Sequence, residues 1–112
     1  MEPGDEHQFS VHVQSGEVAP GGGAVTRVVV RGEVDTATAG LVEAAWPEAL
    51  EPGTPVEVDL SGVSFIDSSG LRSLVVGHKA AVAAGVGLTI VEPTTVVRRL
   101  LDITGLTETL LG

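Results

Sequence analysis

The chain has 112 residues, of which 15 are acidic and 6 are basic, so its formal net charge is −9 at pH 7. This length corresponds to one domain. Nucleic-acid binders and proteins on anionic membranes carry clustered Lys and Arg, so the charge argues against both kinds of partner. The absence of cysteine excludes disulfides, thiolate catalysis and cysteine-ligated metals.

The first eight residues are polar and acidic, and they lack the basic and apolar regions of a signal peptide. Residues 1–8 are therefore predicted to be a disordered lead, followed by a single domain over residues 9–111. No window contains 18 uninterrupted apolar residues, so no membrane span is predicted. We expect a soluble, cytoplasmic protein.

The domain is predicted to begin with a hairpin. Apolar and polar residues alternate from Phe9 to Gln14, which is the pattern of a half-buried strand. Three glycines, Gly21–Gly23, precede a second strand at about residues 25–31. Because a strand and not a helix follows them, the glycines are interpreted as a hairpin turn rather than a phosphate-binding loop.

The next segment is expected to be helical, from Thr36 to about Leu50. Asp35 or Thr36 is the natural N-cap, because a side-chain oxygen there accepts from unpaired helix amides. Pro47 lies inside this segment and is expected to bend the helix or split it near Trp46.

The second half alternates strands with helices. A strand at residues 56–60 is expected to break at Ser61-Gly62, with apolar residues continuing to Asp67. Leu106–Leu111 is interpreted as a short edge strand or a last turn. The other predicted elements are a helix at about 68–84 that ends at Gly85, a strand at 87–91, and a helix from Pro93 or Thr94 to Ile103. The pattern predicts an α/β fold, a mixed β-sheet of four to five strands with helices packed against it.

The helix at 68–84 has two distinguishable faces. One apolar stripe is predicted to be buried, and it consists of Leu71, Leu74, Val75, His78 and Val82. A different face carries Arg72, Val76, Lys79 and Ala83. His78 is interpreted as a packed residue because it lies on the apolar stripe.

The most distinctive segment is Val58–Leu71, which delivers Asp67-Ser68-Ser69 to the start of a helix. One interpretation is capping, because Asp and Ser oxygens satisfy the unpaired amides of a helix start. The other is phosphorylation of Ser68, because a phosphoryl group there would meet free N–H donors and the positive end of the helix dipole. In that interpretation Gly70 leaves room for the active site of another protein.

Three segments together resemble the STAS domain family, specifically a stand-alone bacterial anti-sigma factor antagonist, also called an anti-anti-sigma factor. They are Gly32–Ala39, Val58–Leu71 and Val96–Leu106. The second is the most specific, because Asp67-Ser68-Ser69-Gly70-Leu71 is close to the signature of the family. The resemblance covers roughly residues 9–111 and implies a small STAS-like fold.

The resemblance implies a partner-switching role and no enzymatic activity. Members of this group bind an anti-sigma factor, which is a serine kinase of the histidine-kinase-like ATPase fold, and so free the sigma factor. The kinase phosphorylates the position of Ser68, and a PP2C-type phosphatase removes the phosphate. ATP is bound by the kinase, so no cofactor is expected in this chain. A monomer or weak dimer is expected.

Carried over by position, Ser68 is the expected phosphoacceptor. The residues expected to form the phosphosite loop and the partner-binding surface are Asp35, Asp67, Ser69, Gly70, Arg72 and Lys79. Arg72 departs from the family, in which a small residue often occupies this position. It is interpreted either as a partner for a phosphate on Ser68 or for an acidic group of another protein, or as a solvated side chain.

Other sites are less well supported. Ser69 and His78 are nine residues apart on one predicted helix, roughly 13 Å along its axis, which is too far for a catalytic hydrogen bond. A phospho-aspartate or metal site at Asp35 and Asp67 lacks the acidic pair expected after a first strand. No catalytic or metal residues are therefore predicted. The alternatives within the family are an accessory subunit of a lipid-transport ATPase, against which the intact acceptor motif argues, or a stressosome-type scaffold.

Overall fold

The computed structural model describes residues 8–111. The predicted N-terminal lead lies outside this range except for Gln8. The elements, in order, are β1 (Ser10–Val18), β2 (Ala24–Val34), α1 (Ala39–Glu43), α2 (Trp46–Leu50), β3 (Val56–Ile66), α3 (Ser68–Ala83), β4 (Leu88–Val91), α4 (Thr95–Thr104) and α5 (Thr107–Leu111).

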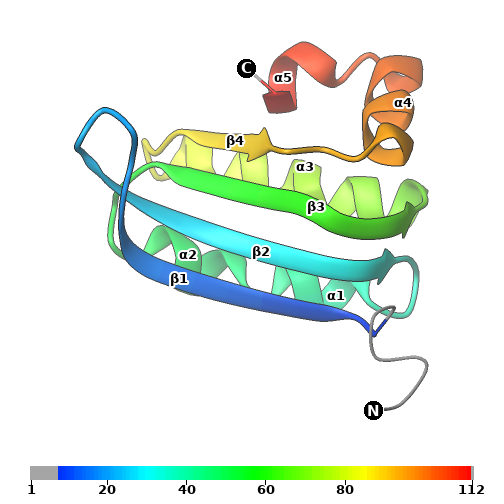
Figure 1. Ribbon diagram of the computed structural model, residues 1–112, viewed down its shortest axis with the longest axis horizontal. Coiled ribbons are helices and arrows are strands. Elements are labelled where there is room, and N and C mark those ends of the chain that lie inside the picture. The colour runs from blue at the N-terminus through cyan, green and yellow to red at the C-terminus, as the bar shows by residue number, and fades with distance from the viewer. Residues whose placement is uncertain (1–7, 112) are drawn as a thin grey trace.

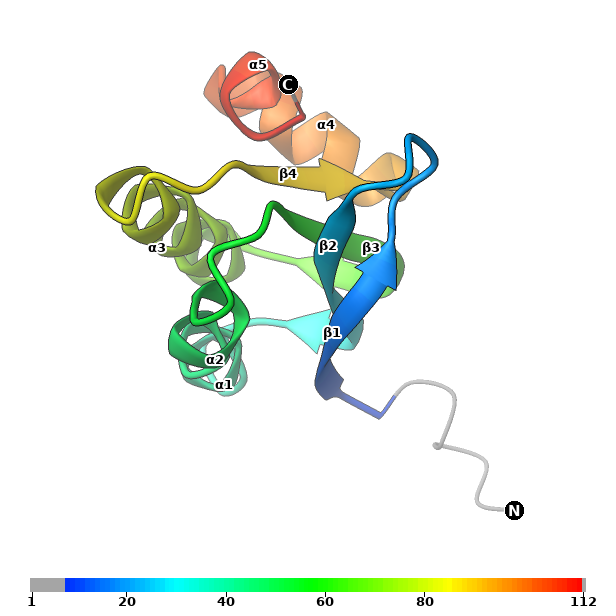
Figure 2. The same ribbon diagram turned by 90° about the vertical axis from the view of Figure 1, so that its left-hand side faces the viewer.

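The four strands form one sheet in the order β1-β2-β3-β4 (Figure 1). β1 is antiparallel to β2, whereas β2, β3 and β4 are parallel. Helices α1, α2 and α3 cover one face, and α4 and α5 lie at the β4 side (Figure 2). The predicted mixed sheet with packed helices is confirmed.

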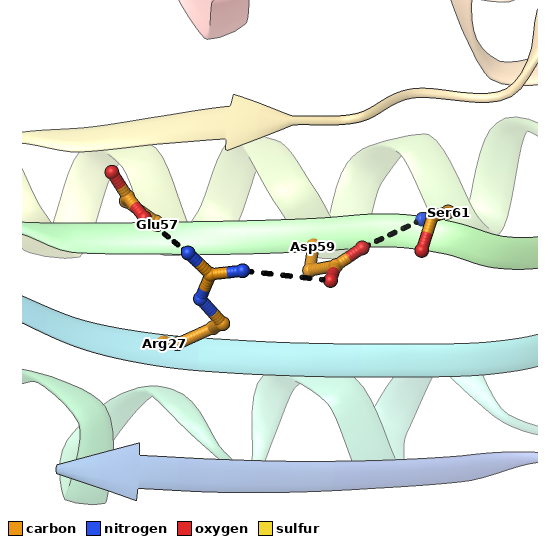
Figure 3. Close-up of polar contacts among 4 residues, drawn as sticks. All are labelled: Arg27, Glu57, Asp59 and Ser61. Atoms are coloured by element: carbon orange, nitrogen blue, oxygen red, sulfur yellow. Dashed lines mark hydrogen bonds and ion pairs between the residues drawn. The ribbon is translucent and has the colours of Figure 1, made fainter. Parts of the chain in front are cut away.

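The two faces of the sheet differ in chemistry, as the alternation along the strands requires. Alternate residues in the middle of β2 and the first half of β3 point into the apolar core, including Val28, Val30, Val58 and Leu60, which are at most 1% exposed. The opposite face carries an ion-paired group (Figure 3). In it, Arg27 contacts Glu57 at 3.0 Å and Asp59 at 3.8 Å, and the Ser61 amide donates to Asp59 Oδ1.

Pro47 splits the predicted helix of residues 36–50 into α1 and α2, as expected. Pro47 occupies the first turn of α2, where its missing N–H costs no hydrogen bond. The predicted helix start is wrong, because residues 36–38 form a turn and α1 begins at Ala39. Of the two interpretations of Leu106–Leu111, the edge strand is wrong and the last turn agrees with the structure, in which the five-residue helix α5 buries Leu110 in the core.

β3 continues through Ser61-Gly62 where the sequence predicted a break. The register with β2 shifts around this point, and Gly62 pairs with Arg31. A Cβ at Gly62 would lie 2.8 Å from Arg31 Cγ, so glycine keeps the two strands together here.

The buried face of α3 is rotated relative to the predicted stripe. Val82 is 64% exposed and His78 is only half-buried, and the observed buried residues are Gly70, Leu71, Ser73, Leu74, Gly77 and Ala81. The cause is Trp46, whose Nε1 donates to the Ser73 carbonyl at 2.9 Å. A Cβ at Gly77 would meet the indole ring at about 2.5 Å, so this glycine provides the space for Trp46.

Gly85 terminates α3 as predicted. Its φ is +72°, the left-handed conformation that glycine adopts most readily. The Gly85 amide donates to the Val82 carbonyl and the Val86 amide to the Ala81 carbonyl, which together form a Schellman motif.

Candidate functional site at the start of α3

Because β2 and β3 are parallel, the loops that follow them lie side by side at the carboxyl ends of the strands, here called the carboxyl edge. Val34 pairs with Ile66 at the end of the ladder, and the Asp67 amide donates to the Val34 carbonyl at 3.3 Å. Asp35 and Asp67 therefore follow neighbouring strand ends, at the right-hand edge of the sheet in Figure 1. This carboxyl edge is where α/β folds usually place binding loops.

Asp67 is the N-cap of α3. Its Oδ1 accepts from the Ser69 and Gly70 amides at 2.9 and 3.0 Å, and its carbonyl accepts from the Leu71 amide. The capping interpretation is confirmed. The expectation that a phosphoryl group would find free donors is wrong for these three amides, because Asp67 already occupies them.

Gly70 is buried beneath the helix start and touches the end of the sheet. A Cβ here would clash with the Val34 carbonyl oxygen and lie 2.7 Å from Ile66 Cγ1. The expectation that Gly70 leaves room for another protein is therefore wrong. Its missing side chain instead lets α3 begin directly against the ends of β2 and β3.

The two adjacent serines have different surroundings. Ser68 is the first residue of α3, its side chain is exposed, and its hydroxyl has no hydrogen-bond partner within residues 8–111. Ser69 is half-buried, and its Oγ lies 3.3 Å from Thr36 Oγ1. Thus Ser69 joins the two loops while Ser68 faces outward. The sequence predicts Thr36 only as an N-cap and misses its bond to Ser69. The signal for this role is the position of Thr36 directly after Asp35, at the end of β2.

Asp35 stabilises the turn before α1. Its Oδ1 accepts from the Ala37 and Thr38 amides at 3.0 and 3.2 Å. Thr38 Oγ1 accepts from the Asp35 amide and donates to the Glu33 carbonyl. The prediction that Asp35 or Thr36 caps the helix is therefore wrong, since the N-cap residue of α1 is Thr38, which makes no side-chain cap hydrogen bond. Asp35 instead caps the turn between β2 and α1.

Arg72 and Lys79 both lie exposed on α3, and neither forms an ion pair with a residue in the range 8–111. Arg72 is one turn from Ser68, about 6 Å along the helix axis, whereas Lys79 is about 16 Å away. The structure therefore places Arg72 at the site edge and Lys79 farther along the same helix.

Two large apolar side chains, one in β3 and one in α1, are exposed. Phe65, two residues before Asp67, is 45% exposed, and Leu41 in α1 is 55% exposed. The sequence pattern counted Phe65 as part of the apolar strand signal, because composition does not distinguish the two faces at a strand end. Exposed apolar side chains next to polar loops are common at protein–protein contact surfaces.

No group of three or more His, Asp or Glu side chains within residues 8–111 has the arrangement of a metal site. No helix in the same range combines the length and the apolar character needed to cross a membrane.

The family model "Mlab, STAS domain" matches residues 20–112. No curated protein sequence matches the chain.

Three solved structures share the fold of this chain over most of their own length. An anti-sigma factor antagonist from Mycobacterium paratuberculosis is 27% identical, with a TM-score of 0.70 covering 93% of this chain and 84% of that chain. One from Thermotoga maritima is 24% identical, with a TM-score of 0.72 and coverages of 96% and 87%. The phosphorylated form of the Bacillus cell fate determinant SpoIIAA is 19% identical, with a TM-score of 0.64 and coverages of 93% and 89%.

Proposed function

The chain belongs to the STAS domain family, and from that premise we propose that it is an anti-sigma factor antagonist, switched off by phosphorylation of Ser68. In the cytoplasm, the unmodified chain binds an anti-sigma factor that is a serine kinase of the histidine-kinase-like ATPase fold, and so frees a sigma factor. The kinase transfers the γ-phosphoryl group of ATP to Ser68 Oγ, and ADP and the hydroxyl proton leave. A PP2C-type phosphatase hydrolyses the phosphoester.

The observation that supports this proposal most strongly is that neighbouring residues at the start of α3 have different surroundings. Asp67 caps the helix, Gly70 packs against the sheet, and Ser69 bonds to Thr36. Only Ser68 at this position is exposed with a hydroxyl free of partners in residues 8–111. A phosphoacceptor must be accessible in this way, because the transferring enzyme has to reach its oxygen atom.

The comparisons support the same role. The mycobacterial antagonist covers nearly the whole chain at 27% identity. SpoIIAA has been solved in unphosphorylated and phosphorylated forms, so a STAS fold accepts a phosphate without losing its architecture.

Phosphorylation would act on the local charge. It adds about −1.5 to −2 charges at pH 7 beside Asp67 and near Asp35, both of which are half-buried. A partner surface that makes an apolar contact with Phe65, which is 45% exposed in the unmodified chain, would then have to enclose this added charge. Enclosing a charge in an apolar contact costs desolvation free energy, so the modification releases the kinase.

The test is a labelling experiment with an anti-sigma serine kinase from the same organism and Mg-ATP. We expect one phosphate on the wild-type chain, mapped to Ser68 by mass spectrometry, and none on Ser68→Ala. Ser69→Ala is the matched control and should be labelled normally. Label that persists on Ser68→Ala overturns the assignment of the acceptor.

A binding measurement separates this proposal from its alternative. The unmodified chain should bind the kinase with 1:1 stoichiometry, and Ser68→Asp should bind more weakly with an unchanged far-UV CD spectrum. A chain that binds no such kinase but copurifies with the ATPase of a lipid transporter would instead support the accessory-subunit role.

A further inference from the structure

The start of α3 offers an added phosphate few of the donors that usually stabilise one. The amides of Ser69, Gly70 and Leu71 already donate to Asp67. Asp67 is adjacent to Ser68, and Asp35 lies at the neighbouring strand end. A phosphate on Ser68 would therefore add negative charge to a region that already holds two carboxylates, and its charge needs a cation from elsewhere.

Arg72 is the basic residue placed to supply it. It follows Ser68 by four positions in α3, and side chains at this spacing lie on the same helix face with Cβ atoms about 5–6 Å apart. Its side chain is exposed and has no ion-pair partner in residues 8–111. A guanidinium group can bind two phosphate oxygens at once.

Of the five other basic residues, Arg27 and Lys79 are poorly placed. Arg27 lies on the open face of the sheet, where its guanidinium already contacts Glu57 and Asp59 (Figure 3). Lys79 is on α3 but about 16 Å from Ser68 along the helix axis.

We propose that Arg72 is the counter-charge of phosphorylated Ser68, with its guanidinium bound to the phosphate oxygens across one turn of α3. The relevance of this pair in the cell rests on the proposed phosphorylation of Ser68, but the pair itself is a property of the phosphorylated chain. Arg72 is a positioning residue here, since it holds the phosphate and takes no part in the transfer.

The pair gives the modification a second effect on the partner-binding surface. In the unmodified chain Arg72, which has no ion-pair partner within residues 8–111, can contact an acidic group of another protein. In the phosphorylated chain it is held by the phosphate. Phosphorylation therefore adds negative charge and withdraws a positive one from the same edge.

The experiment needs no kinase. Phosphoserine is incorporated at position 68 during translation, and the second pKa of the phosphate is measured by ³¹P NMR titration in the otherwise wild-type chain and in Arg72→Gln. The guanidinium favours the dianion, so Arg72→Gln should raise this pKa, ordinarily about 6, by about 0.3 units or more. The same shift should shrink in 1 M NaCl.

Lys79→Gln is the matched control, because it removes one exposed charge from the same helix and should move the pKa by less than about 0.1 units at its greater distance. Arg72→Lys keeps the charge without the two-point contact and should give an intermediate value. Equal pKa values in Arg72→Gln and Lys79→Gln, with native CD spectra, would overturn the pair. Loss of kinase labelling alone would count against the proposed function and leave the pair intact.

Discussion

Acidic side chains gather at two places in this molecule, and the two places satisfy them differently. On the open face of the sheet, Glu57 and Asp59 share the guanidinium of Arg27 (Figure 3). At the start of α3, Asp67 and Asp35 are satisfied by backbone amides, and no cation contacts either of them within residues 8–111. The first group is partly neutralised, because Arg27 from the neighbouring strand offsets one of its two negative charges. The second keeps its charge, beside an exposed hydroxyl.

The difference predicts that an added phosphate would change the local charge balance more at the second place. Amides fix the direction of a carboxylate but leave its net charge unbalanced, so an added phosphate changes the local field strongly. In the first place one guanidinium already offsets one of the two carboxylates, and all three side chains are half-buried. Substitutions that remove one feature of either place at a time should differ in how much unfolding free energy they cost.

The largest effect is expected from Gly70→Ala. The new Cβ would overlap the Val34 carbonyl oxygen and Ile66, and forcing extra volume into packed structure costs about 1–3 kcal/mol. Urea unfolding should show this loss. Gly40→Ala in α1 is the control, because nothing lies within 4 Å of its Cβ, and it should be neutral or stabilising by up to about 1 kcal/mol. Equal stabilities of the two variants would contradict the close packing at Gly70.

The next effect is the loss of the α3 cap. Asp67→Ala leaves the Ser69 and Gly70 amides without their acceptor, and removal of an N-cap costs about 1 kcal/mol of unfolding free energy. Asp67→Asn keeps an accepting oxygen and should lose less than about half of that. If both variants lose the same free energy in urea, the charge and not the capping geometry stabilises the helix start.

A smaller effect is expected on the sheet face. Arg27 and Glu57 have side chains that are 36% and 24% exposed, so solvent screens their attraction. A double-mutant cycle with Arg27→Met and Glu57→Gln should give a coupling of about 0.5 kcal/mol, decreasing in 1 M NaCl. A coupling that does not depend on salt would mean that packing, and not charge, joins the two side chains.

The smallest effect on stability is expected from Ser68→Ala. The side chain is exposed and forms no hydrogen bond within the described residues. The substitution should therefore change the free energy of unfolding by no more than about 0.5 kcal/mol, as measured by urea unfolding. A loss of 1 kcal/mol or more would show that Ser68 helps to cap α3 and would weaken its assignment as a free acceptor.

Strong local patterns in the sequence predicted most elements correctly. Pro47 marked the split between α1 and α2, Gly85 marked the end of α3, and the Gly21–Gly23 turn joins β1 to β2. These features act within a few residues, because a fixed φ or a missing side chain decides the local backbone. The α/β class followed from the same signals in their order.

The errors occur where a distant part of the chain decides the outcome. The buried face of α3 includes Gly77 and Ser73, which no apolar pattern selects, because Trp46 packs there from another helix. Gly70 was assigned to an intermolecular role, although the Val34 carbonyl from β2 occupies the space beside it.

At the candidate site, the sequence by itself determined which residues are present in one motif: an Asp that can cap, two serines, a glycine and an Arg one turn later. Local spacing was enough for this, because helix starts have fixed hydrogen-bond requirements. Only the tertiary structure decided which serine is free. Thr36, which is 33 residues away in sequence, bonds to Ser69 because parallel pairing of β2 and β3 brings their loops together, and Ser68 is left facing outward.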